Sequence, residues 1–323
     1  MQELITQFKD PEILQSNVTF VLVADNNNPE VGRGNGVTRE VLSLFWKDFS
    51  ISLSIGAAEK VPCIRHDYQR DEWLSIARII VFGFCNQRYF PIFLSKAFVA
   101  SCMYGEDALT RKCLLDSFCI YVSKDEQETI KKCLEGEIDV NDEDLLDLLS
   151  SYKCYRLPTQ ESIKSILEEL AHQELVQKPK YITMAWSPQL EALKGFSEFH
   201  DLNSMCTMYE RKKPTSKHVI KLLKADPSSD AERASFDHLK RFIKSLDDSK
   251  LAGLLQFITG SNIIAVTEIE VAFTSSVGAH RCIVAHTCGP LLELPSTFQT
   301  YSELSEEFTN TLANSFAWLF DIV

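Results

Sequence analysis

The residue of this 323-residue chain that is best suited to catalysis is Cys288, which lies in the sequence His-Thr-Cys-Gly at residues 286–289. Short apolar, strand-like runs flank this motif, so we expect the cysteine on a loop between two strands. Such a loop can expose a thiol while its neighbours stay packed, and a nucleophile that meets a large second substrate must be exposed. His286 and Thr287 could stabilise a thiolate or orient an incoming group. From these residues alone, a structural role for the cysteine is the alternative.

The segments around the motif are predicted to be short strands and helices that hold it in place. A helix is predicted over residues 248–259, and Gly260 can end it in the left-handed conformation. Thr300 and Glu303 are predicted to cap a final helix that runs to about residue 314. Strand-like runs lie at residues 263–264, 269–273, 282–284 and 291–294. These patterns predict a compact α/β unit in the last hundred or so residues.

The first 215 or so residues are predicted to be mainly helical, with one early strand. The strand is predicted at residues 18–23, and helices at residues 37–49, from about 71, at 89–103, at 159–175 and after Ser187-Pro188. Two helices of the chain begin at capping boxes, Ser123 with Glu126 and Ser229 with Glu232. In a capping box the serine hydroxyl and the glutamate carboxylate each satisfy an orphan backbone N–H.

A polar, basic segment at residues 210–214, Glu-Arg-Lys-Lys-Pro, is the best candidate for a linker between domains. A chain of this length exceeds what one small core usually covers. We therefore predict an α+β protein of two lobes joined by a hinge. The first lobe, residues 1–212, is mainly helical, and the second, residues 213–323, is the smaller α/β unit that carries Cys288.

The composition bounds the functional classes. The formal net charge is −12, from 33 Lys and Arg against 45 Asp and Glu. This acidic balance argues against a protein that wraps nucleic acid, because clustered Lys and Arg are needed to neutralise the phosphates. No stretch approaches the roughly 18 uncharged apolar residues of a membrane span, and no secretory signal is recognisable. The ten cysteines and seven histidines show no metal-ligand spacing. We therefore expect reduced thiols, no cofactor or metal, no membrane partner, and a cytoplasmic or nuclear location.

Several motifs, taken in their order along the chain, resemble the HECT family of ubiquitin ligases. Near the C-terminus these are Leu-Gln-Phe-Ile-Thr-Gly at residues 255–260, His-Thr-Cys at 286–288 and Leu-Glu-Leu-Pro at 292–295. Gly-Val-Thr-Arg-Glu at residues 36–40 looks like the opening of the HECT N lobe, and Trp73, Ala77 and Arg78 followed by Pro91 look like the helix pair after it. Residues 171–182 are similar to the divergent branch of the family that contains the G2/M-phase-specific ubiquitin ligase.

The resemblance implies a bilobal HECT-like fold and an E3 ubiquitin ligase activity. Cys288 would accept ubiquitin as a thioester from a conjugating enzyme (E2) and pass it to a lysine of a protein substrate. Thr287 or backbone N–H groups would stabilise the oxyanion of the transfer step, and His286 would order the loop rather than act as a base. Phe320, in the tail, would settle the C lobe against the N lobe, and Asp321 is a candidate acid for the lysine-attack step.

The sequence also departs from the family pattern. Gly289-Pro290 stands where the family usually has Phe-Asn, which removes an aromatic ring and an amide beside the nucleophile. Residues 105–180, where HECT proteins dock the E2, are abbreviated and unfamiliar, so we assign no docking residues. The alternative function is therefore a catalytically weak or inactive HECT-like scaffold that binds ubiquitin, an E2 or another protein. A Cys–His hydrolase that uses Cys288 is a third class.

Overall fold

The structure is a computed structural model that describes residues 1–21, 34–137 and 139–313, and the chain divides into two compact units. Unit 1 comprises Met1–Leu14, Lys47–Val81 and Pro91–Thr207, and unit 2 comprises Gln15–Trp46, Phe82–Phe90 and the chain from Met208 onward. Many helices and two small sheets make the protein α+β, as predicted. A movable boundary between residues 212 and 213 stays a prediction, because compactness alone does not show which segments move.

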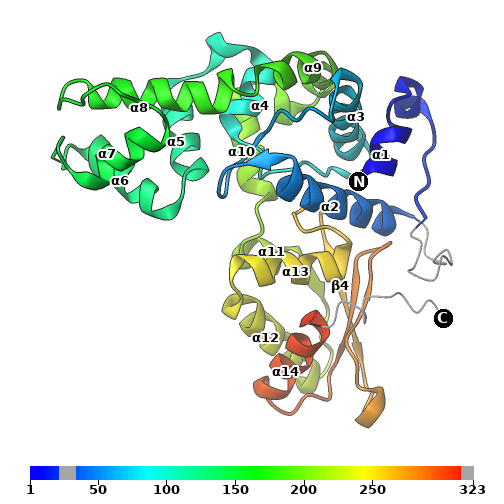
Figure 1. The fold of residues 1–323 in the computed structure, drawn as a ribbon. Coiled ribbons are helices and arrows are strands. Elements are labelled where there is room, and N and C mark those ends of the chain that lie inside the picture. The colour runs from blue at the N-terminus through cyan, green and yellow to red at the C-terminus, as the bar shows by residue number, and fades with distance from the viewer. Residues whose placement is uncertain (22–33, 138, 314–323) are drawn as a thin grey trace. The chain divides into compact units, whose positions relative to one another are not determined.

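Unit 1 is mainly helical (Figure 1). Its short strands β1 (Ser54–Ile55) and β2 (Val61–Pro62) pair antiparallel. The α-helices that lie wholly within it are α1 (Gln2–Gln7), α4 (Lys96–Tyr104), α5 (Arg111–Tyr121), α6 (Lys124–Glu135), α7 (Glu143–Ser151), α8 (Ile163–His172) and α9 (Lys180–Leu190). A π-helical turn, Gln173–Gln177, follows α8, and 3-10 turns lie at Glu106–Ala108, Glu191–Gly195 and Ser197–Phe199.

Aromatic side chains fill the centre of unit 1. The ring of Trp186 lies 5.4 Å from that of Phe98 and 6.3 Å from that of Phe49, measured between centroids. Phe49 also meets Trp73 edge to face at 6.4 Å. Large aromatic rings bury much apolar area each, so a few of them supply much of the cohesion of this unit.

Three helices contribute residues to both units: α2 (Asn35–Ser52), α3 (Arg70–Gln87) and α10 (Leu202–Lys212). A further 3-10 turn, Pro11–Gln15, ends at the first residue of unit 2. The first turns of α2 belong to unit 2, where they contact the turn that carries Cys288. The strongly apolar spacing in α2 and α3 was visible in the sequence, and both helices are present where they were predicted.

Unit 2 is built on a four-stranded sheet in the order β3-β4-β6-β5. The pairs β3–β4 and β4–β6 are parallel, and β5–β6 is antiparallel. The strands are β3 (Leu223–Ala225), β4 (Ile269–Thr274), β5 (Val284–His286) and β6 (Leu291–Pro295). The helices beside the sheet are α11 (Ser216–Leu222), α12 (Asp230–Ser245), α13 (Asp248–Thr259) and α14 (Tyr301–Ala313), with a 3-10 turn at Gly278–His280 (Figure 1).

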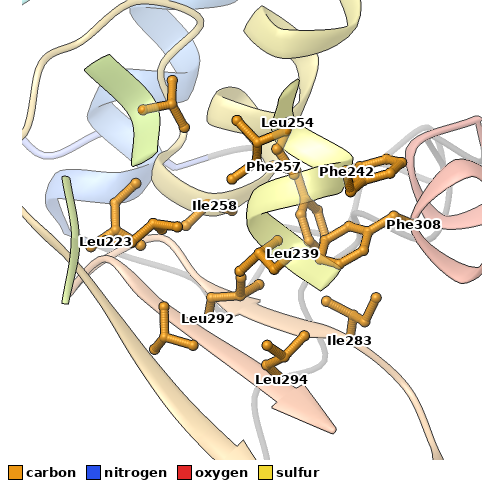
Figure 2. Packing of buried hydrophobic residues seen from close by; sticks show 14 of the residues in the cluster. Leu223, Leu239, Phe242, Leu254, Phe257, Ile258, Ile283, Leu292, Leu294 and Phe308 are labelled. Carbon is orange, nitrogen blue, oxygen red and sulfur yellow. The ribbon is translucent and has the colours of Figure 1, made fainter. Parts of the chain in front are cut away.

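The sheet and its helices enclose an apolar core, part of which is drawn in Figure 2. Leu292 and Leu294 of β6 are fully buried there with Leu239 of α12. The rings of Phe242 and Phe308 stack with their centroids 4.9 Å apart. Because side chains alternate along a strand, β6 turns two leucines inward and leaves Glu293 on the opposite face.

Local sequence signals explain where these helices begin and end. Both predicted capping boxes are present, Ser123 with Glu126 at α6 and Ser229 with Glu232 at α12. Gly260 ends α13 with φ +76°, the left-handed conformation that a glycine adopts without strain. The predictions of these two capping boxes and of the helix end at Gly260 are therefore confirmed.

Other predictions of local structure were wrong. Residues 18–21 of the predicted strand are irregular, and residues 22–23 lie outside the described residues. Residues 263–264 form no strand, and the helix predicted from residue 89 begins only at Lys96, where Ser95 caps it. Ser187-Pro188 lies inside α9 instead of starting a helix, because the buried side chains of α9 keep that helix in place up to residue 190.

Candidate functional site

The candidate site is the turn at residues 287–290, which joins β5 to β6. Cys288 and Gly289 are exposed in this turn, whereas Thr287 is only 4% exposed. The position predicted for Cys288, on a loop between two strands, is confirmed. The geometry presents a thiol to solvent beside a packed residue, and a protein-sized substrate can reach such a thiol.

Hydrogen bonds hold the turn on both sides of the cysteine. The carbonyl oxygen of Thr287 accepts from Nη2 of Arg39 at 2.5 Å. The carbonyl oxygen of Pro290 accepts from the backbone N–H of Glu270 in β4 at 2.9 Å. Since the residues flanking Cys288 and Gly289 are fixed, little conformational freedom is left for the sulfur-bearing residue between them.

The backbone at the start of α2 packs directly on this turn. A Cβ placed on Gly36 would lie 2.2 Å from Oγ1 of Thr287, so only a glycine fits at that position. Gly34 has φ +121°, and a Cβ there would lie 3.4 Å from Sγ of Cys288. Gly260, at the end of α13, approaches from another side, where an added Cβ would lie 2.4 Å from the carbonyl oxygen of Gly36. Three glycines thus permit the close approach of three backbone segments.

His286 is paired with a carboxylate. Its Nε2 atom lies 2.9 Å from Oε1 of Glu293, and both side chains are partly exposed. In the antiparallel register Val284 is opposite Glu293 and His286 is opposite Leu291, so the histidine and the glutamate are diagonal neighbours on one face of the sheet. A histidine held in this way can order the turn that follows it.

The other predicted site residues have different outcomes. The side chain of Thr287 is buried against Gly36, and its carbonyl oxygen is the atom that Arg39 binds. A role for the Thr287 hydroxyl in the transfer step stays a prediction, as does the loop-ordering role of His286. Phe320 and Asp321 lie outside the described residues.

The predicted linker at residues 210–214 is partly helical, since α10 extends to Lys212. Lys212 is buried, and its ammonium group donates to the carbonyl oxygen of Arg88. The backbone carbonyl of Lys212 accepts from the N–H of Ile264 at 2.9 Å. Movement about this segment stays a prediction, and these contacts would have to change during it.

The remaining cysteines differ from Cys288 in exposure and chemistry. No disulfide joins any of the ten cysteines, all of which fall within the described ranges. Cys282 and Cys85 are also exposed, whereas burial raises the pKa of Cys102 to about 12 and keeps that thiol protonated. In the described part of the chain, no group of three or more His, Cys, Asp or Glu side chains is arranged to hold a metal ion.

Two residues of the site were not singled out from the sequence. Arg39 belongs to the Gly-Val-Thr-Arg-Glu motif, but nothing in the motif shows that its guanidinium binds a carbonyl 248 residues away. Glu293 is the polar residue between two leucines in Leu-Glu-Leu-Pro, and this alternation was the available signal that it faces away from the core. The Arg39 contact depends on long-range packing, whereas the contact of Glu293 with His286 depends on the register of β5 on β6.

Comparisons with known proteins identify no family for this chain. No protein-family model matches the chain, and no curated protein matches it at a significant level. Among the described residues, none of the helices has the length and apolar character needed to cross a bilayer. The likeness to HECT ligases therefore rests on the motifs quoted from the sequence.

Proposed function

We propose that this protein is an E3 ubiquitin ligase of the HECT type, which carries ubiquitin as a thioester on Cys288. One observation carries the proposal: an exposed cysteine in a His-Thr-Cys motif lies on a turn whose flanking carbonyls are both held by hydrogen bonds. A carrier cysteine must be reachable by another protein and must also be held in a reproducible position. The order of the motifs along the chain, which resembles the HECT family, gives the same assignment.

The chemistry asked of Cys288 is acyl exchange in two steps. The thiolate attacks the carbonyl carbon of the thioester that joins ubiquitin to the E2, the new C–S bond forms, and the E2 cysteine leaves as a thiolate. A lysine amine then attacks the new thioester, the C–N bond forms, Cys288 leaves as a thiolate, and the amine loses its proton to solvent or a base. The first step exchanges one thioester for another, so the protein contributes mainly by positioning.

Unit 2 supplies the parts this chemistry needs near the sulfur. The turn is anchored to β4 through Pro290 and to the start of α2 through Thr287. His286 and Glu293 lie on one face of the sheet next to the turn and order its entry. The turn accommodates the departure at Gly289-Pro290. Proline has no N–H to donate, but β4 binds residue 290 through its carbonyl oxygen, which proline keeps.

The proposal is tested by following ubiquitin on the intact chain. The protein is incubated with activating enzyme, a panel of E2 enzymes and ubiquitin, and the products are separated with and without reductant. We expect an adduct that reductant removes and that is absent in Cys288→Ala. Cys282→Ala, which removes another exposed thiol six residues away, is the matched control and should leave the adduct intact.

Each other outcome of this assay selects a different function. Binding of ubiquitin or an E2 without any adduct would make the protein a HECT-like scaffold. Release of free ubiquitin from a ubiquitin chain, dependent on Cys288, would make it a cysteine hydrolase. An adduct that survives in Cys288→Ala would remove Cys288 as the carrier.

A further inference from the structure

Arg39 is a cation that binds the Cys288 turn directly, through the carbonyl oxygen of Thr287. It lies near the start of α2 and is 5% exposed. Its guanidinium donates to the carbonyl oxygen of Thr287 at 2.5 Å, to that of Thr259 at 2.6 Å and to Oε1 of Gln87 at 3.2 Å. The fork geometry of arginine allows one side chain to bind acceptors from three separate segments at once.

The position of the guanidinium is itself fixed by a second layer of contacts. Gln87 accepts from Arg39 through its carbonyl oxygen and donates through its amide to Oδ1 of Asn35 at 3.0 Å. Oγ of Ser43, one turn further along α2, lies 2.9 Å from the carbonyl oxygen of Arg39 and 3.1 Å from that of Gly260. A side chain held at this many points cannot shift without moving the backbone it binds.

These hydrogen bonds do not neutralise the positive charge of Arg39. The three acceptors are two amide carbonyls and a side-chain amide, and all three are neutral. Burial lowers the pKa of Arg39 from its ordinary value, and interaction with a Cys288 thiolate acts in the opposite direction. An arginine keeps its proton throughout the range in which proteins work, so the positive charge persists beside the site.

We propose that Arg39 is a positioning residue for the acyl exchange at Cys288: it fixes the turn through the Thr287 carbonyl and keeps a buried positive charge close to the sulfur. The inference rests on the proposed ligase function. Cys288, which is negatively charged as the attacking and as the leaving thiolate, directly follows the residue whose carbonyl that guanidinium binds. Both effects act on the rate of exchange after the E2 has bound, and neither adds surface for binding it.

The experiment uses single-turnover transfer of ubiquitin from a charged E2 to the full chain, over a range of E2 concentrations. For Arg39→Met we expect the maximal rate to fall at least tenfold, with the half-saturating E2 concentration within twofold of wild type. Arg39→Lys keeps the charge but can reach fewer acceptors, so its maximal rate should lie between the rates of wild type and Arg39→Met. Arg78→Met is the matched control, because Arg78 is buried in unit 1 and also donates to two backbone carbonyls.

The kinetic outcomes decide between positioning and general structural support. All rates are compared at a temperature where each variant is fully folded by circular dichroism. Arg78→Met should transfer within twofold of wild type. The proposal is overturned if Arg39→Met transfers at the wild-type rate, if only its half-saturating concentration rises, or if the two methionine variants lose rate equally.

A second readout needs no ubiquitin, so it separates the failure of this inference from the failure of the ligase proposal. Alkylation of Cys288 by iodoacetamide is followed by peptide mass spectrometry at pH 7, with exposed Cys282 as the internal reference. In Arg39→Met we expect the rate at Cys288 to fall at least threefold relative to the rate at Cys282. An unchanged ratio of the two rates would refute the positioning role whether or not the wild type loads ubiquitin.

Discussion

Each unit contains a buried arginine that binds backbone carbonyls of distant segments. The two arginines differ in how many of their guanidinium nitrogens donate hydrogen bonds. In unit 2, Arg39 uses Nε, Nη1 and Nη2 to bind three segments. In unit 1, Arg78 binds the adjacent carbonyls of Phe8 and Lys9 through Nη1 alone, at 2.9 Å each. Within the described residues, the buried Nε of Arg78 has no hydrogen-bond partner.

The difference shows what decides the importance of a buried cation. Arg78 ties a short N-terminal segment to α3, and that segment carries no reactive group. Arg39 ties the start of α2 to the end of α13 and to a turn that exposes a thiol. A guanidinium in which all three nitrogens donate orders its surroundings more strongly than one with an orphaned nitrogen. The arginine that donates from all three nitrogens is the one beside the candidate site.

The largest expected effect is on stability, and it tests this ranking directly. Arg39→Met leaves three acceptors without a charged donor and should lower the free energy of unfolding by about 2–4 kcal/mol. Arg78→Met breaks two hydrogen bonds but also removes an unsatisfied donor, so about 1–2 kcal/mol is expected. Urea unfolding followed by circular dichroism measures both. Equal losses, or a larger loss at Arg78, would contradict the comparison.

A smaller effect is expected from adding one methyl group to the same network. Gly36→Ala would place a Cβ 2.2 Å from Thr287 Oγ1, and relief of that clash should cost about 1–3 kcal/mol. Gly253, inside α13, is the control, because nothing lies within 4 Å of a Cβ placed on it. Gly253→Ala should raise the free energy of unfolding by about 0.5–1 kcal/mol, since alanine is the better helix former.

Thermal and urea unfolding of the two glycine variants should therefore move in opposite directions. Gly36→Ala should also displace the Cys288 turn, which is read as a changed ratio of Cys288 to Cys282 alkylation. If Gly36→Ala is as stable as wild type, the close contact between α2 and the turn is absent in solution.

The smallest expected effect is a pH dependence in unit 1. Glu59 is 5% exposed, and burial raises its pKa above the ordinary value of 4.5, against hydrogen bonds from Ser117 and the Lys96 N–H. Just above pH 4.5 the folded chain therefore holds a proton that the unfolded chain has lost. Stability should fall as the pH rises from about 4.5 through the folded-state pKa of Glu59.

Glu59→Gln removes this titration and keeps an oxygen that can accept from the Lys96 N–H. The check is a series of urea unfolding curves between pH 4 and 7 for wild type and variant. The difference in unfolding free energy between them should grow in favour of the glutamine with rising pH. Parallel curves would show that Glu59 keeps its ordinary pKa in the folded chain.

Much of the local structure was predictable because its causes are local. The Ser123–Glu126 and Ser229–Glu232 boxes are made within four consecutive residues, and both start helices as expected. The predicted strand at residues 18–23 was wrong for its described part, because a β-branched run makes a strand only when a partner strand is present to bond it. The start of a helix at Ser187-Pro188 was wrong because burial of the α9 face outweighs the local signal.

The amino-acid sequence by itself determined that Cys288 lies between two short strands, since that depends on apolar alternation and turn residues close to it. Only the tertiary structure decided that buried Arg39 holds the carbonyl of Thr287, 248 residues further along the chain, and that glycines at 34, 36 and 260 let three backbone segments meet there. The physical reason is that a hydrogen bond between remote segments exists only after packing of the whole unit has brought its donor and acceptor within 3 Å or so of each other.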